Sequence, residues 1–249
     1  LEALFALKAE GHLYSRISNP TVGALEDKYT KLEGGVGAVA TASGQSAILY
    51  AVLNLCKAGD HIISVTSLYG GTVNLFNVHL KNLGIEVSFV EPDASEEEIL
   101  SLAKENTKAI YGETIGNPGL NILDFDKFSS VAKKIQVPLI IDNTVATPYH
   151  CNPFEHGANI VVHSTTKYSE GHAQTIGGIV VDGGNFDWTN GKFNDFTTPD
   201  PSYHGIKFAE AVGEAAYVTR IRAIVLRDTG ATISPFNAFI LLQGLETLS

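Results

Sequence analysis

The chain has 249 residues, of which 44% are hydrophobic and 18% charged, a balance typical of a globular protein and not of a disordered one. Its formal net charge of −10 argues against nucleic acid or an anionic membrane surface as a partner. No apolar run is long enough for a membrane-spanning helix, and two cysteines are too few for a disulfide framework. We therefore expect a protein of a reducing compartment, the cytoplasm.

The N-terminal part of the sequence is expected to be helical. Residues 1–33 contain two helical patterns, and Asn19-Pro20 marks a break and a restart, with Thr21 as the expected N-cap of the second helix. The chain has no methionine, and both of its ends lie within helical patterns. We expect it to be part of a longer protein.

Two glycine-containing stretches follow, and only the second suits an anion. Gly35, Gly37 and Ala40 match the G-x-G-x-x-A pattern of dinucleotide-binding folds, but a helical pattern precedes them where that motif requires a strand. We therefore reject a nucleotide site there. Residues 42–46, ASGQS, open an apolar helical run, and the free N–H groups and dipole of a helix start favour a phosphate. An ordinary glycine-containing helix start is the alternative.

From residue 59 onward, strand and helix patterns alternate. This order predicts a largely parallel sheet with helices on both faces, and such sheets bind ligands beyond the carboxyl ends of their strands. The aromatic segment 183–205 has no periodicity and is predicted to be a functional or lid-like loop, and one long helix is predicted over 207–228. The predicted strands cover 61–65, 85–90, 108–113, 137–142, 160–163 and 176–182, and the predicted helices between them cover 72–83, 95–106 and 125–135.

One lysine directly beyond a predicted strand has an unusual setting. Lys167 follows the apolar strand 160–163 after three small hydroxyl residues, and a glycine-rich stretch comes next. An amine held at the mouth of a sheet can lose its proton and attack a carbonyl, as Schiff-base lysines do. An ordinary loop lysine is the alternative. The residues at the other strand ends distinguish between these two interpretations.

The other strand ends supply the groups that a pyridine cofactor bearing an aldehyde and a phosphate needs. Tyr69 offers a ring to stack on, and Asp142 offers an acid that can keep a ring nitrogen protonated. Lys167 offers the amine for the aldehyde. The expected phosphate donors are Ser43, Gly44, Gln45, Ser164 and Thr166.

The sequence resembles the Cys/Met-metabolism family of pyridoxal-5′-phosphate (PLP) enzymes over essentially the whole chain, on the motifs YSRISNPT, TASGQSA, SLYGGT, IIDNT and HSTTKYSEGH. The resemblance implies an α/β protein of fold type I, with a mostly parallel seven-stranded sheet and a small C-terminal domain that this chain largely lacks. It implies that residues 1–40 contact a neighbouring subunit and that residues 41–249 form the large PLP-binding domain. It also implies a homo-oligomer, a dimer of active sites within a tetramer.

The resemblance gives each motif residue an expected role. Lys167 resembles the Schiff-base lysine, Asp142 the partner of the pyridinium nitrogen, and Tyr69 the ring-stacking tyrosine. Tyr14 and Arg16 match residues that reach the phosphate of the neighbouring subunit's cofactor. The remaining expected PLP-binding residues are Ser43, Gly44, Gln45, Glu113, Asn117, Thr144, Ser164 and Thr166, with Asn117 near the phenolic oxygen.

Within the family, the segments FDWTNGKF, PDPSYHG and SPFNAFILLQGLETLS resemble those of O-acetylhomoserine sulfhydrylases. The implied reaction is γ-replacement on O-acetyl-L-homoserine by sulfide or a thiol, giving homocysteine or methionine and acetate. The arginine that grips the substrate's α-carboxylate lies in the family's C-terminal domain, outside this chain. The alternatives are a cystathionine γ-synthase, a γ- or β-lyase acting on cystathionine or methionine, a nucleotide-binding dehydrogenase and a non-catalytic scaffold.

Several other residues have plain structural interpretations. Four histidines match no zinc-binding spacing, so we predict no metal site. An aromatic group within 183–205 is expected to form a packed lid or a subunit contact, and three arginines of 207–228 suit the C-terminal end of a helix. These residues are His150, His156, His163, His172, Phe186, Trp188, Phe193, Arg220, Arg222 and Arg227.

Overall fold

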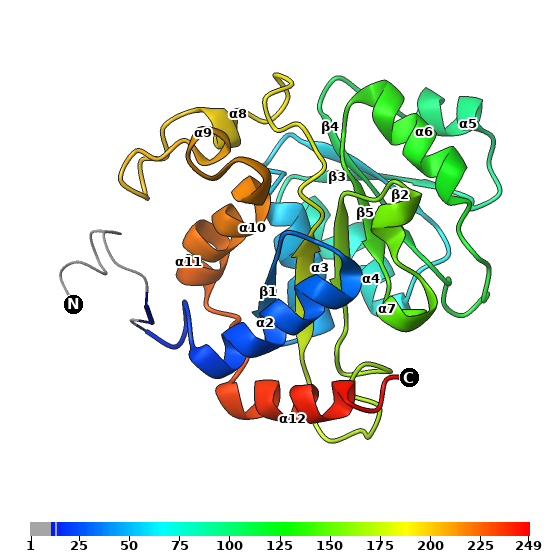
Figure 1. Cartoon of the computed structure of the whole chain (residues 1–249). Coiled ribbons are helices and arrows are strands. Elements are labelled where there is room, and N and C mark those ends of the chain that lie inside the picture. Colours follow the sequence, from blue (N-terminus) through cyan, green and yellow to red (C-terminus); the bar gives the residue numbers. More distant parts are fainter. Residues whose placement is uncertain (1–10, 13) are drawn as a thin grey trace.

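A seven-stranded sheet forms the centre of the part of the chain that the computed structural model describes, residues 11, 12 and 14–249 (Figure 1). Its strands lie in the order β1-β7-β6-β5-β4-β2-β3. The strands are β1 (Gly37–Thr41), β2 (His61–Val65), β3 (Glu86–Val90), β4 (Thr107–Glu113), β5 (Leu139–Asp142), β6 (Ile160–His163) and β7 (Gly178–Asp182).

All strands but β7 run in one direction. β2 pairs in parallel with β3 and β4, and the parallel pairing continues through β5 to β6. β7 is antiparallel to both β6 and β1, so β1 again runs with the parallel set. The carboxyl ends of the parallel strands therefore lie along one edge of the sheet, called the carboxyl edge below. The prediction of a mostly parallel seven-stranded sheet is confirmed.

β1 is the strand that the sequence pattern does not place. Its residues, GAVAT, are small and follow two glycines, so their pattern does not separate strand from loop. Because α2 (Pro20–Glu33) precedes β1, the stretch containing Gly35, Gly37 and Ala40 leads from a helix into a strand. That order is the reverse of the strand-to-helix turn of a dinucleotide site, and rejection of that site agrees with the structure.

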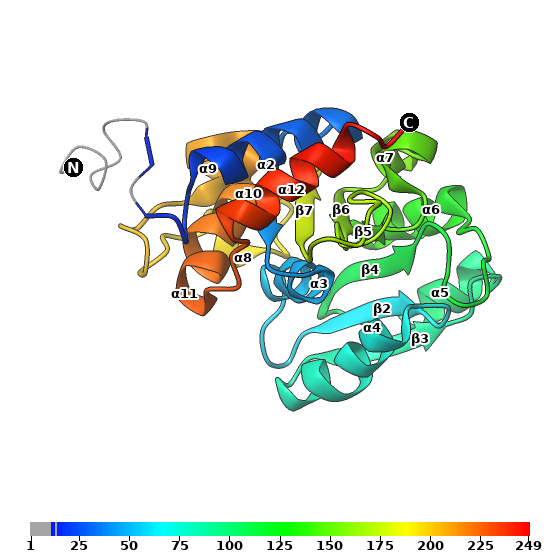
Figure 2. The same ribbon diagram turned by 90° about the horizontal axis from the view of Figure 1, so that it is seen from below.

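Helices cover both faces of this sheet, with α3 and α4 on one side and α5 and α6 on the other, while α2 and α12 pack side by side (Figure 2). Besides α2, the α-helices are α3 (Gly44–Leu53), α4 (Gly70–Asn74), α5 (Glu96–Ser101), α6 (Phe125–Ile135), α7 (Thr147–His150), α8 (Asn194–Thr197), α9 (Phe208–Val212), α10 (Ala216–Arg220), α11 (Arg227–Thr229) and α12 (Pro235–Leu245). The remaining turns are π-helical at Leu75–Leu80 and Ile221–Leu226 and 3₁₀-helical at Pro153–His156 and Gly213–Ala215.

Local capping sets two helix boundaries differently from the prediction. Asn19, not Thr21, caps α2, because its side-chain oxygen accepts the N–H of Thr21 at 3.0 Å and Pro20 takes the first helical position. α5 ends at Ser101, well before the predicted residue 106. The chain turns there because Lys104 and Thr107 bond to each other and lead directly into β4.

The single long helix predicted over 207–228 is wrong. α9 ends at Gly213, whose φ of 53° and ψ of −121° belong to a region that only glycine adopts easily. The chain then continues through the Gly213–Ala215 turn, α10, the π-helical Ile221–Leu226 and α11. A single periodic pattern therefore conceals a break that one glycine permits.

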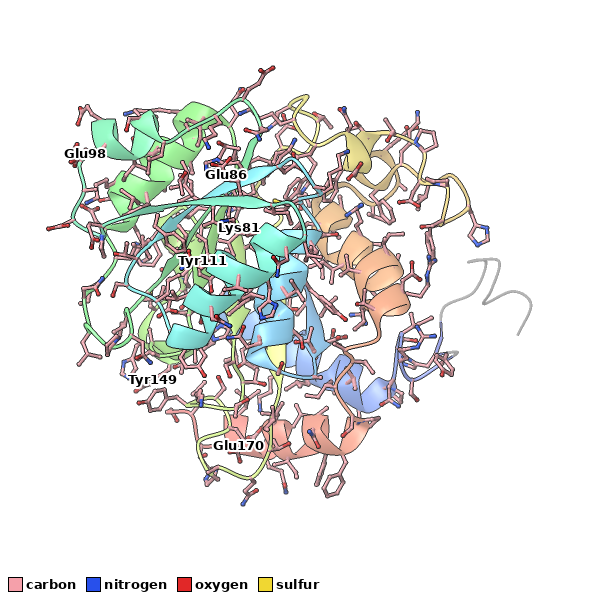
Figure 3. All side chains as sticks on the ribbon, turned by 180° about the vertical axis from the view of Figure 1, so that it is seen from behind. Lys81, Glu86, Glu98, Tyr111, Tyr149 and Glu170 are labelled. Carbon is pink, nitrogen blue, oxygen red and sulfur yellow. The ribbon has the colours of Figure 1, made fainter. Side chains whose placement is uncertain are left out.

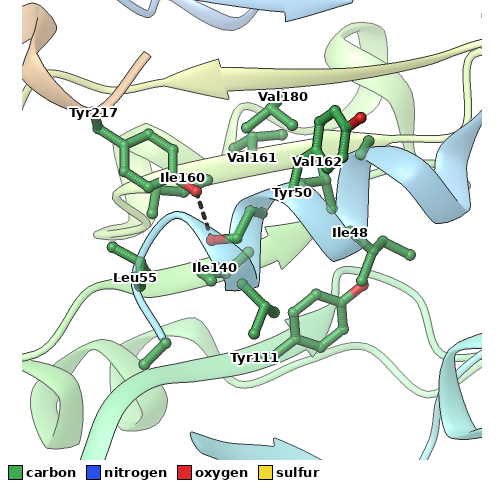
Figure 4. Close-up of a cluster of buried hydrophobic side chains, with 14 of the residues drawn as sticks. Ile48, Tyr50, Leu55, Tyr111, Ile140, Ile160, Val161, Val162, Val180 and Tyr217 are labelled. Atoms are coloured by element: carbon green, nitrogen blue, oxygen red, sulfur yellow. Dashed lines mark hydrogen bonds between the residues drawn. The ribbon is translucent and has the colours of Figure 1, made fainter. Parts of the chain in front are cut away.

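The middle strands of the sheet are buried on both faces. Ile160, Val161 and Val162 of β6 and Val180 of β7 are fully buried, as expected for parallel strands with helices on either side. Tyr217 of α10 packs in the same cluster, and its hydroxyl donates to the Ala51 carbonyl of α3 at 2.9 Å (Figure 4). That hydrogen bond allows the large polar side chain to be buried without loss.

The segment 183–205 is anchored by an aromatic cluster, which we define as Phe186, Trp188, Phe193, Phe196 and Tyr217. Trp188 is buried, and its ring stacks on Phe196 and Tyr217 with centroid distances of 4.5 and 5.3 Å. Phe193 meets Trp188 edge to face at 5.3 Å. The expected packing of this aromatic group is present within a single chain, and its role as a lid or subunit contact stays a prediction.

The three arginines predicted to suit a helix C-terminus have specific side-chain partners. Their guanidinium groups form ion pairs with carboxylates of other segments or of the next residue, so local charge preference is only part of their role. The pairs are Arg220 with Asp195 at 3.6 Å, Arg222 with Glu26 at 2.7 Å and Arg227 with Asp228 at 2.7 Å.

Candidate active site

Two acidic side chains lie beside each other at the carboxyl edge. Glu113 ends β4 and Asp142 ends β5, and the two are register partners across this parallel pair. Burial raises the pKa of Asp142, although hydrogen bonds from Thr144 and the charge of His163 partly oppose the rise. Burial, and then the negative charge of Asp142, raise the pKa of Glu113 to about 8. A cationic ligand beside Asp142 would compensate for the burial of that carboxylate.

Thr144 connects Asp142 to the neighbouring strand end. Its hydroxyl and its backbone N–H both donate to Asp142 Oδ1, the N–H at 3.0 Å. The same hydroxyl accepts the backbone N–H of Ser164 at 2.8 Å. Tyr111, whose side chain lies in the interior, donates to Asp142 Oδ2 at 3.3 Å (Figure 3). Asp142 is therefore held by three donors, and the loop that carries Ser164 is tied to the same group.

The start of α3 meets the loop that follows β6. Ser43 caps α3, and its hydroxyl accepts the N–H of Ser46 at 3.2 Å. Gly44 approaches Ser164 so closely that an added Cβ would lie 2.5 Å from the Ser164 Cβ, a separation that no side chain tolerates. The helix start and Ser164 thus bring N–H and hydroxyl donors close together, which suits a phosphate.

Glu113 holds Tyr69 in place. One of its carboxylate oxygens accepts the backbone N–H of Tyr69 at 2.7 Å, and the backbone N–H of Asn117 also donates to this side chain. The Tyr69 ring is 51% exposed and lies against Gly71, where an added Cβ would be 2.5 Å from the ring and 2.7 Å from the Gln45 amide nitrogen. Tyr69 therefore offers a half-exposed ring next to the start of α3.

Lys167 is exposed on a loop whose backbone is fixed by hydrogen bonds. Its N–H donates to the Ser164 carbonyl at 3.2 Å, and its own carbonyl accepts the N–H of Gly171 at 2.9 Å. Glu170, which lies buried beside α12, accepts two further loop N–H groups at 3.1 and 3.0 Å (Figure 3). Within the described part of the chain, no hydrogen bond or ion pair engages the Lys167 ammonium. The amine is available to a ligand.

The structure does not bring every predicted residue to this site. The hydroxyl of Thr166 donates to the Gly177 carbonyl at 3.1 Å, so it is occupied within its own loop. Tyr14 is 57% exposed, and the guanidinium of Arg16 lies 5.0 Å from its ring and donates to the Arg227 carbonyl. These two residues lie next to α11 and not at the carboxyl edge of their own chain. Their role at a neighbouring subunit stays a prediction.

Two groups at the site have no counterpart in the sequence analysis. Tyr111 is concealed within an apolar strand, and only the structure shows that it donates to Asp142. Glu33 forms a buried pair with His163 on the other face of the sheet. A signal for Glu33 does exist, because a carboxylate in the last turn of a helix opposes the helix dipole and suggests a partner elsewhere.

These donors suit PLP better than a metal ion. Across residues 11, 12 and 14–249, no three His, Cys, Asp or Glu side chains are grouped to hold a metal. The carboxyl edge instead presents a buried acid, an exposed amine, a half-exposed aromatic ring and a helix start that only glycine can form beside Ser164. PLP requires an acid for its ring nitrogen, an amine for its aldehyde and anion donors for its phosphate, so the residues fit it.

A mostly parallel α/β sheet with these groups at its carboxyl edge is the arrangement expected of a PLP-dependent enzyme. The chain belongs to the Cys/Met metabolism PLP-dependent enzyme family, whose model matches residues 1–249. It is 51% identical to the O-acetyl-L-homoserine sulfhydrylase of Leptospira meyeri, over 98% of this chain and 57% of that protein. It is 48% identical to the homocysteine/cysteine synthase of Kluyveromyces lactis, over 99% of this chain and 56% of that protein. The predicted family is confirmed.

A solved structure agrees with the fold. A crystal structure from Campylobacter jejuni, described as a candidate O-acetylhomoserine (thiol)-lyase with N′-pyridoxyl-lysine-5′-monophosphate, matches 99% of this chain and 62% of that one. The TM-score is 0.95 at 39% sequence identity, which confirms the predicted fold class. The chain thus spans just over half the length of the relatives it matches. Among the described helices, none has the length and apolarity needed to cross a membrane.

Proposed function

We propose that this chain forms the PLP-binding part of an enzyme that replaces the γ-substituent of O-acetyl-L-homoserine with sulfide or a thiol. The products would be homocysteine, or methionine from a methyl thiol, and acetate. The observation that carries the proposal is the connected set at the carboxyl edge, in which Thr144 links Asp142 to Ser164 and Ser164 packs on Gly44 beside the exposed Lys167. The substrate is supported by the names of the relatives, at about half identity over nearly the whole chain.

Each member of this set has a proposed role in holding the cofactor. Asp142 would hold the proton on the ring nitrogen, and its three hydrogen-bond donors orient the carboxylate and favour its ionised form against the effect of burial. Tyr69 would stack on the ring, and Asn117 would be near the phenolic oxygen. Ser43, Gly44, Gln45, Ser164 and Thr166 would hold the phosphate, and Thr166 would have to give up its hydrogen bond to Gly177 to do so.

Lys167 is the proposed acid–base residue. When bound, PLP supplies a cationic ring that takes up the electrons released at the substrate's Cα. Once released from the cofactor, Lys167 Nζ would remove the protons from Cα and Cβ, and acetate would leave Cγ. Hydrosulfide would then add at Cγ, and Lys167 would return the protons to Cβ and Cα. Because Lys167 also anchors the cofactor's aldehyde carbon, one residue serves as both anchor and proton carrier.

The whole protein is proposed to be a cytoplasmic homo-oligomer, a dimer of active sites within a tetramer. In it, residues 1–40 would contact the neighbouring subunit, and Tyr14 and Arg16 would reach that subunit's cofactor phosphate. The exposure of Tyr14 and the position of both residues away from their own carboxyl edge support this arrangement. The described residues of this segment also include α2 and β1, which pack in the same core as residues 41–249.

Reconstitution with PLP tests the cofactor site. Mixing the purified protein with PLP should produce an absorbance band at about 400 nm, and borohydride should then fix the cofactor on Lys167. Lys167→Ala should abolish the fixed product, whereas Lys207→Ala, which removes a surface lysine paired with Glu210, should retain it. If the Lys167→Ala protein still carries reducible cofactor, Lys167 is not the anchor.

Product analysis tests the reaction. The protein is supplied with O-acetylhomoserine and sulfide in one assay and with cystathionine alone in another. Homocysteine and acetate in the first assay only are the expected result. Cleavage of cystathionine without the replacement reaction would establish a lyase instead.

A further inference from the structure

A buried acid lies behind the candidate site, on the face of the sheet that carries α2. Glu33 is the last residue of α2, and His163 is the last residue of β6; their side chains are both 0% exposed. His163 Nε2 and Glu33 Oε1 are hydrogen-bonded. Asn143, the residue after Asp142, donates its side-chain N–H to the same Glu33 oxygen at 3.1 Å.

One carboxylate oxygen therefore joins two strand ends. Asn143 directly follows Asp142 at the end of β5, and His163 directly precedes Ser164 at the end of β6. The backbone N–H of Asn143 donates to the Val162 carbonyl at 2.9 Å, which continues the ladder between the two strands. Because successive side chains along an extended chain point to opposite faces, Asn143 lies on the face away from Asp142.

Asn143 has no freedom to turn away from Glu33. Its side-chain oxygen accepts the hydroxyl of Thr114 at 2.8 Å, and its amide nitrogen also donates to the Cys151 carbonyl at 2.9 Å. Thr114 directly follows β4, and Cys151 directly follows α7. A displacement of the Glu33 carboxylate would therefore shift the backbone that carries Asp142.

Stability alone does not explain this arrangement. Removing two ionisable groups from water costs free energy that their attraction often fails to recover, and apolar replacements of buried pairs are often equally stable. Glu33 also lies at the C-terminus of α2, where the helix dipole disfavours a carboxylate. Among the described residues, Glu33 Oε2 and His163 Nδ1 have no hydrogen-bond partner. Stability therefore gives no reason for the Glu33–His163 pair, whereas a role in fixing the geometry of the strand ends does.

We propose that Glu33 is a positioning residue, whose Oε1 sets the separation between the ends of β5 and β6 and thereby places Asp142 relative to the loop of Lys167. This inference rests on the proposed function, because the geometry matters for a ligand that contacts both strand ends. Glu33 does not touch the cofactor. It acts through Asn143 and His163.

Two substitutions of Glu33 distinguish the effect of side-chain length from the effect of side-chain charge. Glu33→Gln keeps the length of the side chain and an oxygen that can accept from both partners, but removes the charge. Glu33→Asp keeps the charge and shortens the side chain by one methylene, so that it cannot reach Asn143 and His163 together. A positioning role predicts that Glu33→Asp weakens PLP affinity about tenfold, as supporting residues behind a bound group typically do. Glu33→Gln should stay within about threefold of the wild type.

Glu26 provides the matched control. It lies seven residues earlier on the same helix, is buried, and its carboxylate bonds to the Ala40 N–H at 2.8 Å and to Arg222 at 2.7 Å. Those partners lie in β1 and in the π-helical Ile221–Leu226, not at the ends of β5 and β6 that Glu33 joins. Glu26→Asp and Glu26→Gln should lower resistance to urea while leaving the PLP affinity of the folded protein unchanged. Urea unfolding of the Glu33 variants then shows whether a change in their PLP affinity exceeds what an equal loss of stability causes in the Glu26 variants.

A second readout does not depend on the cofactor. Amide hydrogen exchange in the PLP-free protein should show faster exchange at Asn143 and Ser164 in Glu33→Asp, but not in Glu33→Gln or the Glu26 variants, since both amides bond across the two strand ends. A wild-type protein that fails to bind PLP would overturn the proposed function, and the exchange data would still decide the positioning role. Equal exchange and equal PLP affinity in both Glu33 variants, or greater loss in Glu33→Gln, would overturn it.

Discussion

Two segments at opposite ends of β7 are held by different kinds of interaction. The loop 164–177, which carries Lys167, is fixed by hydrogen bonds to its own backbone, to Thr144 and to the buried carboxylate of Glu170. The segment 183–205 is fixed by the aromatic cluster around Trp188. Hydrogen bonds are directional, so they can fix a backbone while side chains stay exposed. Stacking fixes a segment only by burying its side chains.

The difference also appears in unsatisfied polar atoms. Within the described residues, loop 164–177 contains three buried side-chain atoms without a hydrogen-bond partner, on Thr165, Ser169 and Glu170. The segment 183–205 contains one, the Trp188 indole nitrogen. Native proteins satisfy most buried polar groups, so each exception needs an explanation, such as a catalytic role or a bound water. The Lys167 loop is therefore suited to holding exposed side chains in fixed positions, and the aromatic segment to stabilising the fold.

The largest expected effect is a loss of stability when the aromatic cluster is disrupted. Trp188→Ala should lower the free energy of unfolding by about 3–5 kcal/mol, because it opens a cavity between Phe196 and Tyr217. Urea unfolding measures this loss, and Trp188→Phe, which keeps a stacking ring, should lose less than half as much. PLP affinity of the folded protein should stay constant. A change in PLP affinity greater than about threefold would mean that the aromatic segment contributes to the PLP site, and the two segments would then not differ in role.

The next effect concerns the link between the two strand ends. Thr144→Val removes the hydroxyl that donates to Asp142 and accepts from Ser164, leaving two buried polar partners unsatisfied. We expect a loss of about 1–3 kcal/mol in unfolding free energy together with weaker PLP binding. Thr144→Ser keeps the hydroxyl and should retain both. Unchanged PLP binding in the valine variant would mean that this link has no part in the site.

A smaller effect tests the contact between α3 and the Lys167 loop. Gly44→Ala places a methyl group 2.5 Å from the Ser164 Cβ, so the helix start and the loop must separate. PLP affinity should fall about tenfold, equivalent to about 1.4 kcal/mol. Gly23→Ala is the control, because an added Cβ there meets only one atom, at 4.0 Å. Titration with PLP, followed by the absorbance band, measures the affinity of both variants. Equal affinities would show that the contact between Gly44 and Ser164 is not part of the PLP site.

The last expected effect is a change in the pH dependence of stability. Glu113 in the folded protein has its pKa raised from 4.5 to about 8 by burial and by Asp142, so the folded state keeps a proton that the unfolded state releases within this window. Stability should therefore fall as pH rises from about 4.5 to about 8, by no more than about 1.4 kcal/mol per pH unit for this group. Glu113→Gln should flatten the fall, whereas substitution of the exposed Glu105 should not. An unaltered slope would show that Glu113 does not titrate there.

The sequence predicts most of the sheet because buried parallel strands form short apolar runs. Strands 61–65 and 160–163 and the helix 125–135 have the predicted bounds. β1 escapes prediction because small residues pack in strands and loops alike, and Gly213 breaks a helix whose periodicity continues on both sides. Element ends depend on single hydrogen bonds, such as that of Asn19, which periodicity does not report.

The candidate site follows the same division. Asp142, Lys167 and Tyr69 could be singled out because they stand at the ends of predicted strands. Contacts that depend on register and on the opposite face of the sheet could not be anticipated. The donation from Tyr111 to Asp142 and the bond from Asn143 to Glu33 both connect residues whose proximity is set only when strands and helices pack.

The position of β7 has a consequence for how the chain folds during synthesis. Among the described strands, β1 pairs only with β7, and its register partners, such as Ala38 and Val181, are more than a hundred residues apart. At ordinary translation rates the ribosome needs on the order of ten seconds to make the intervening chain. Throughout that interval β1 has no partner strand. The nascent protein therefore exposes an apolar strand edge of the kind that chaperones bind. Closure of the sheet therefore waits for the part of the chain that lies just beyond Lys167.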